Sequence, residues 1–149
     1  MSTADDTTDD QPAAKHHRPD GVDDATVEAV GKLTEALETV ERARGHLFAF
    51  HQLTGAADFE LGEAVAALRE ADHEELASDV ETELIGRNVI EGRWTFQIIE
   101  EYDDGYYATF RGFEGRARDE LLQGRRHIYE AEMKEGRRTH GLPGHEAGP

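Results

Sequence analysis

The 149-residue sequence contains no cysteine, and this absence excludes several kinds of site. Without a thiol, the chain forms no disulfide framework, no thiolate metal site and no cysteine nucleophile. Serine is scarce too, since Ser2 and Ser78 are its only copies and neither stands in a setting typical of a catalytic triad. Gly-rich phosphate loops, nucleophile elbows and His-Glu-x-x-His helices are also missing. The sequence therefore contains no standard motif for hydrolysis.

Long hydrophobic runs are missing as well. No apolar run approaches the ~18 residues that a membrane-spanning helix needs. The first ten residues, MSTADDTTDD, lack the basic start and the apolar middle of a signal peptide. From these two features we expect a soluble, cytoplasmic protein without a membrane partner.

Positive charge is the third shortage, because 16 Lys and Arg face 33 Asp and Glu, for a formal net charge of −17. Such a charge disfavours binding to a nucleic-acid backbone, so we expect no nucleic-acid partner. Half of the basic residues nevertheless lie within residues 111–138. It includes the run Arg125-Arg126-His127, followed by Lys134, Arg137 and Arg138. The segment either packs against acidic neighbours of its own or forms a face for phosphate or an acidic partner.

A hydrophobic fraction of 37 % beside a charged fraction of 33 % is typical of amphipathic helices. The sequence predicts an all-α, antiparallel helical bundle of about four helices, the last of them long. This bundle domain occupies residues 23–137. Residues 1–22 form an acidic tail with little to bury, and residues 138–149 form a second tail rich in Gly and Pro. We expect both tails to be disordered.

The first helix has the clearest pattern. Either Asp23 or Asp24 can cap it, and it extends to about Thr54, where Gly55 provides a stop signal. Its apolar residues recur at spacings of three and four: Val27, Val30, Leu33, Leu37, Val40, Leu47 and Phe50. Two short helices, 58–70 and 73–88, follow, with Asp72 as the N-cap of the second. One continuous helix over 58–88 is the alternative.

Residues 93–113 support two interpretations. Alternation around Trp94 and the Asp104-Gly105 dipeptide favour a short β-hairpin. Helical spacing of the aromatic residues favours a long helix that continues to residue 137, with kinks at glycines such as Gly105 and Gly124. We favour the helix.

The apolar seam of the first helix contains polar residues. Its seven-residue repeat places Arg44 and His51 on the seam, where each needs a carboxylate or a ligand as partner. An internal salt bridge is one outcome, and a binding groove between the first and last helices is the other. Our first hypothesis is a non-catalytic binding or interaction protein whose groove receives a protein partner or a small ligand. Its predicted contacts are Arg44, His51, Arg93, Tyr102 and Tyr106.

The alternative hypothesis is a metal-binding bundle of the ferritin-like, carboxylate and histidine kind, with oxidoreductase activity as an option. A divalent metal such as iron, manganese or zinc would be its cofactor. Its predicted ligands are Glu41, His51, Glu100, Asp103, Asp104, His127 and Glu130. No single predicted helix contains the Glu-x-x-His motif of that family, so a solvated acidic face is the simpler interpretation of these acids. Long apolar stripes on so small a domain also make a homodimer an alternative to a monomer.

Two segments resemble known sequences. RNVIEGRWTFQIIEEYDDGYY (residues 87–107) and RRHIYEAEMKEGRRTH (residues 125–140) are similar to a family of small hypothetical proteins from high-GC bacteria. The resemblance covers most of the predicted folded region. Because that family has no known function, the resemblance implies neither an activity nor a ligand.

Overall fold

The computed structural model describes residues 10–148, and over this range the chain is an all-α helical bundle. It contains four continuous helical stretches. The first two are α1 (Asp24–Glu70) and α2 (Glu74–Glu83). The third joins α3 (Thr95–Tyr102), a π-helical segment (Asp103–Tyr107) and α4 (Ala108–Leu122), and the fourth is α5 (Ile128–Arg137). A short 3₁₀ helix, Ala14–His16, precedes them. Within residues 10–148, the only β pairing is an isolated bridge between Ile90 and Arg93. The helix favoured for residues 93–113 is confirmed, and the hairpin is wrong.

Helix α1 begins at its predicted cap and continues well past its predicted end. The backbone N–H of Thr26 donates to Asp23 Oδ1 at 2.8 Å, so Asp23 is the N-cap. The expected stop at Gly55 is wrong, because α1 runs to Glu70. A glycine inside a helix costs only ~1 kcal/mol relative to alanine. The seven-residue seam continues beyond Gly55 through Asp58, Leu61 and Val65, all less exposed than their sequence neighbours, and its packing outweighs that cost.

Two compact units divide the chain, and α1 contributes to both. Unit 1 combines residues up to Glu38 with residues from Phe110 onward, and unit 2 is Thr39–Thr109. The predicted bundle domain, 23–137, therefore contains parts of both units.

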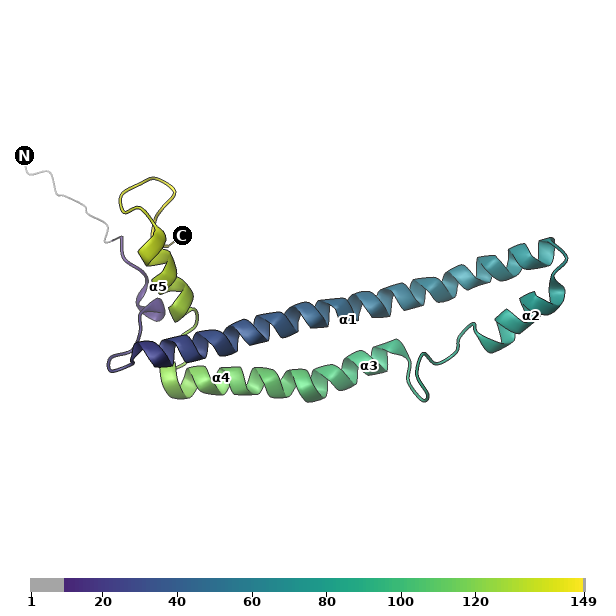
Figure 1. Ribbon diagram of the computed structural model, residues 1–149, viewed down its shortest axis with the longest axis horizontal. Helices are drawn as coiled ribbons and strands as arrows, with labels where there is room; N and C mark the ends of the chain where they lie inside the picture. The colour runs from purple at the N-terminus through teal and green to yellow at the C-terminus, as the bar shows by residue number, and fades with distance from the viewer. Residues whose placement is uncertain (1–9, 149) are drawn as a thin grey trace, which may run out of the picture. The chain divides into compact units, whose positions relative to one another are not determined.

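The core of unit 1 lies where the start of α1 meets the end of α4 and the start of α5. Val27 and Val30 of α1 pack with Leu122 and Ile128, and all four are at most 4 % exposed. Figure 1 shows α4 beside the N-terminal part of α1. This arrangement follows from the apolar spacing of α1, which places Val27 and Val30 on one face of the helix.

Residues before and after the helices of unit 1 hold defined contacts. Arg18 donates to both oxygens of Glu132 on α5, each at 2.9 Å. Arg138 donates to Asp10 Oδ2 at 2.6 Å and to Glu135 Oε2 at 2.7 Å. The disorder predicted for residues 1–22 and 138–149 stays a prediction. The part of that prediction on residues 1–9 lies outside the described residues.

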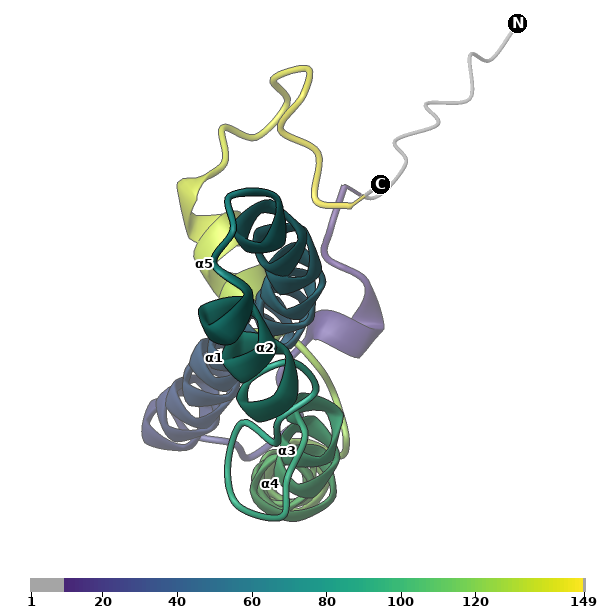
Figure 2. The ribbon, with the colours of Figure 1, turned by 90° about the vertical axis from the view of Figure 1, so that its right-hand side faces the viewer.

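In unit 2, α2 lies along the C-terminal part of α1 (Figure 1, Figure 2). Arg69 of α1 pairs with Glu81 at 2.6 Å and with Glu74 at 3.0 Å. Only three apolar residues of the unit are classed as buried: Val65, Ala77 and Ile99. Unit 2 therefore has a thin core.

Several predicted helix ends are corrected. Asp72 does not cap α2, because it adopts a left-handed backbone (φ 67°) and His73 is the N-cap. The predicted helix 73–88 ends at Glu83. The long last helix is broken between α4 and α5, where Gln123, Gly124 and His127 all have positive φ. The kink expected at Gly124 is thus a full break in the helix.

Of the helices in residues 10–148, none is both long and apolar enough to span a membrane.

Candidate binding site

The polar residues on the α1 seam of unit 2 contact the antiparallel segment that follows α2. Arg44 Nε donates to Asp103 Oδ1 at 2.8 Å, and its Nη2 donates to Oδ2 at 3.0 Å. The guanidinium also lies 5.0 Å from the centroid of the Phe48 ring and 4.7 Å from that of Tyr107. The Tyr107 hydroxyl donates to Glu41. Arg44 therefore has the carboxylate partner that its seam position requires.

The ion pair joins Arg44 of α1 to the first residue of the π-helical segment, Asp103. Asp103 and Tyr107 are the first and last residues of that segment, and both contact α1. The hydrogen bonds from Arg44 hold the pKa of Asp103 below its usual value, and they raise the pKa of Arg44. The pair is therefore ionised at neutral pH and acts as a fixed clasp between α1 and the π segment.

Two further contacts continue this line along α1. His51 Nδ1 is hydrogen-bonded to Thr95 Oγ1 at 2.6 Å, and the backbone N–H of Gly86 donates to Asp58 Oδ1 at 2.9 Å. These bonds fix the chain between α2 and α3 against α1. A pocket lies between these two hydrogen bonds.

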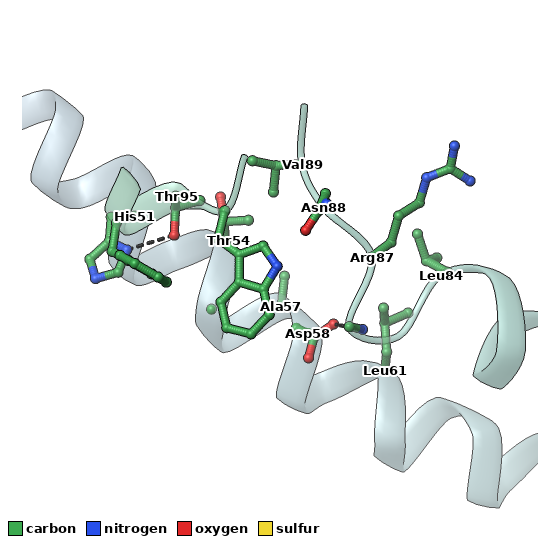
Figure 3. Close-up of a pocket in the computed structure, with 14 residues that line it drawn as sticks. His51, Thr54, Ala57, Asp58, Leu61, Leu84, Arg87, Asn88, Val89 and Thr95 are labelled. Carbon is green, nitrogen blue, oxygen red and sulfur yellow. Dashed lines mark hydrogen bonds between the residues drawn. The ribbon is translucent and has the colours of Figure 1, made fainter. Parts of the chain in front are cut away.

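This pocket has a volume of about 560 Å³. Figure 3 shows Leu61 and Leu84 at one end of it and the His51–Thr95 bond at the other, with Val89 and Asn88 on the connecting segment. The Arg87 side chain extends away from the other labelled residues (Figure 3). The pocket is lined by His51, Thr54, Gly55, Ala57, Asp58, Leu61, Leu84, Gly86, Arg87, Asn88, Val89, Trp94, Thr95 and Phe96. Its walls are mainly apolar, with a few polar groups already bonded to the protein.

The large apolar side chains that line this pocket are about half-exposed to water. Trp94 is 56 % exposed, Leu84 48 %, Phe96 42 % and Val89 40 %. The rings of Trp94 and Phe96 meet edge to face with centroids 5.6 Å apart. Burying these side chains against another apolar group would be favourable at about 25 cal/mol per Å².

The predicted binding residues divide between this pocket and its surroundings. His51 lines the pocket, whereas Arg44 is held by Asp103. Arg93 pairs with Glu101 at 2.9 Å. Tyr102 and Tyr106 contact each other, with ring centroids 5.7 Å apart. Of the five predicted contacts, His51 alone lines this pocket, and the binding role of all five stays a prediction.

The predicted metal ligands do not gather into a metal site. Residues 10–148 contain no group of three or more His, Cys, Asp or Glu side chains arranged to hold a metal ion. Asp103 instead accepts hydrogen bonds from Arg44, and Glu41 accepts one from Tyr107. His51 is hydrogen-bonded to Thr95. Glu100 and Asp104 are exposed on the surface of unit 2. In unit 1, His127 Nδ1 lies 4.0 Å from Glu130 Oε2.

Sequence reasoning missed most of the pocket lining. Leu84, Val89 and Asn88 belong to a connection whose path depends on the turn after α2, which no local pattern specifies. The aromatic density around Trp94 was the one available signal, since Trp94 and Phe96 both line the pocket. No protein-family model, curated protein or solved structure matches this chain.

Proposed function

We propose that this chain is a non-catalytic binding protein whose unit 2 receives a cationic, amphipathic segment of a partner protein. The observation that carries the proposal is the pocket of about 560 Å³ with its half-exposed apolar walls. Pockets of this size and composition are typical of sites that bury an apolar group. A large apolar side chain of the partner would fill it, as in the recognition of amphipathic helices by grooves.

The charge of unit 2 supports a cationic partner. Within residues 39–109, Asp and Glu outnumber Lys and Arg by about three to one. Three exposed acids lie within two residues of the pocket lining in the sequence: Glu60, Glu83 and Glu91. None of them forms an ion pair with the described part of the chain. Opposite charges around an apolar anchor raise the rate of association and exclude wrong partners.

A second copy of the chain is the other occupant to consider, as a homodimer over the same surface. Two acidic surfaces repel each other, so salt would strengthen such a dimer by screening the repulsion. Salt would instead weaken a complex with a cationic segment. The sign of the salt dependence therefore separates the two occupants.

Trp94 provides the test, because it is the only tryptophan in the sequence and lines the pocket. The probe is a designed amphipathic helix of leucine and lysine, and its counterpart of leucine and glutamate is the charge control. We expect the lysine peptide to shift the Trp94 emission to shorter wavelength and to saturate, because it moves the indole out of water. The glutamate peptide should have no effect.

Two leucines provide matched variants. Leu84 lines the pocket and is 48 % exposed, whereas Leu76 on α2 lies outside it and is 55 % exposed. Leu84→Gln should weaken binding of the lysine peptide about tenfold, as expected for loss of a central apolar contact. Leu76→Gln should leave it within about twofold of the wild type. Equal binding by both variants, or equal shifts with both peptides, would rule out this site.

A further inference from the structure

Unit 1 contains a pocket with a basic lining, in a chain whose formal net charge is −17. The pocket has a volume of about 480 Å³ and is formed by the 3₁₀ helix and the turn between α4 and α5. Lys15 and His16 line it from the 3₁₀ helix, and Arg125, Arg126 and His127 line it from the turn. No Asp or Glu is among its lining residues.

Hydrogen bonds between the two segments hold these cations together. Arg125 Nη1 donates to the backbone oxygen of His17 at 2.6 Å. His16 Nδ1 is hydrogen-bonded to the backbone oxygen of Arg126 at 3.2 Å. Both bonds use backbone oxygens as acceptors, so they fix the geometry without bringing a carboxylate to these side chains.

Three other arginines of unit 1 are paired with carboxylates. Arg18 pairs with Glu132 at 2.9 Å, Arg118 with Glu114 at 2.7 Å, and Arg138 with Glu135 at 2.7 Å. For the basic segment 111–138, the sequence allowed either packing against acidic neighbours or an anion-binding face. The first interpretation holds at Arg138, which pairs with Glu135.

The Arg125 end is different. Among residues 10–148, no carboxylate lies within ion-pair distance of Lys15, Arg125 or Arg126. Three acids lie near the pocket lining: Glu130, 4.0 Å from His127 Nδ1, Asp119, which lies beside Gly124, and Glu114, whose pKa is lowered in part by the charge of Arg126. Two arginines and a lysine therefore share one pocket, and none of the three forms an ion pair with a carboxylate of the described residues.

We propose that this pocket binds the phosphate group of a small anionic molecule. Arginine and lysine are the side chains that bind phosphate most often, through charge-assisted hydrogen bonds. A volume of about 480 Å³ holds a phosphate and a small organic group attached to it. The acidic surface elsewhere does not prevent binding, because salt at 0.15 M screens charges beyond ~8 Å. The site is separate from the pocket of unit 2 and does not depend on its function.

Calorimetric titration of the full chain with inorganic phosphate and with glycerol phosphate tests the proposal. We expect saturable binding that weakens as sodium chloride is raised. The double variant Lys15→Gln/Arg126→Gln should raise Kd at least about tenfold, because it removes two charged donors. The matched control, Lys134→Gln/Arg137→Gln, removes one lysine and one arginine from exposed positions of α5 outside the pocket. It should keep Kd within about twofold.

The two ligands distinguish the sources of the phosphate group. Tighter binding of inorganic phosphate would support the free anion as the ligand, and tighter binding of glycerol phosphate would support a phosphorylated small molecule. The proposal is overturned if neither ligand gives saturable binding. It is also overturned if the pocket variant binds like the wild type, or if the control loses as much affinity as the pocket variant.

Discussion

Glu114 of α4 is 5 % exposed and shows how a charge is accommodated at the scale of one residue. Its carboxylate accepts hydrogen bonds from Arg118 Nε at 2.7 Å, Arg118 Nη2 at 3.1 Å and the Thr34 hydroxyl at 3.0 Å. Burial raises the pKa of Glu114, but the hydrogen bonds from Arg118 and Thr34 outweigh burial, so the pKa lies below its usual value of 4.5. The ionised form is therefore the one that unit 1 stabilises.

Replacing Glu114 should destabilise the protein in a pH-dependent way. Glu114→Ala leaves Arg118 without its partner and should cost about 1.5–3 kcal/mol at pH 7. Because the native pKa is lowered, this difference from the wild type is complete above about pH 4.5 and shrinks as pH falls through the native pKa. Urea unfolding followed by circular dichroism between pH 7 and pH 3 measures it. Thr34→Val, which removes one neutral donor, should cost about 1 kcal/mol. A difference for Glu114→Ala that stays constant to pH 3 would contradict this interpretation.

Helix α1 allows a prediction at the scale of one element, because its glycines occupy different surroundings. A Cβ on Gly62 would meet no other atom within 4 Å, whereas a Cβ on Gly31 would lie 3.2 Å from Cβ and Cγ of Tyr129. Gly62→Ala should stabilise the protein by about 0.5–1 kcal/mol, since alanine favours the helix. Gly31→Ala gains the same helix preference but crowds the base of the tyrosine side chain, and overpacking typically costs 1–3 kcal/mol.

Urea unfolding of the two variants checks this contrast. The free energy of unfolding of Gly31→Ala should be lower than that of Gly62→Ala by at least about 1 kcal/mol. Equal stabilisation by both substitutions would mean that Tyr129 does not pack on Gly31.

Element by element, the sequence predicts what depends on local periodicity and misses what depends on packing. The spacing of apolar residues identifies the first part of α1 and the seam positions of Arg44 and His51, and Asp23 is one of the two caps that the sequence predicts. The same local rules predict that the helix ends at Gly55, but packing along the seam extends α1 to Glu70. Asp103 was assigned to a metal, because sequence spacing does not reveal that Arg44 lies opposite it. The pocket walls around Leu84 depend on a connection without any periodic signal.

Taken as a whole, the described chain buries few large apolar side chains and leaves many half-exposed in unit 2. A partner that binds the native state alone stabilises it by mass action. A cationic amphipathic segment that covers Trp94, Leu84 and Phe96 should therefore raise the melting temperature of the protein as well as bind to it. Differential scanning calorimetry with and without the leucine and lysine peptide measures this effect. An unchanged melting temperature at saturating peptide would contradict it.

Titration of Trp94 fluorescence with the leucine and lysine peptide, at low and high sodium chloride, tests most directly whether unit 2 binds a cationic segment. We expect a saturable shift of the emission to shorter wavelength, with an affinity that falls as salt rises. An affinity that is unaffected by salt would contradict the cationic partner. A shift that needs no peptide, and that grows with protein concentration and with salt, would instead assign the surface to a second copy of the chain.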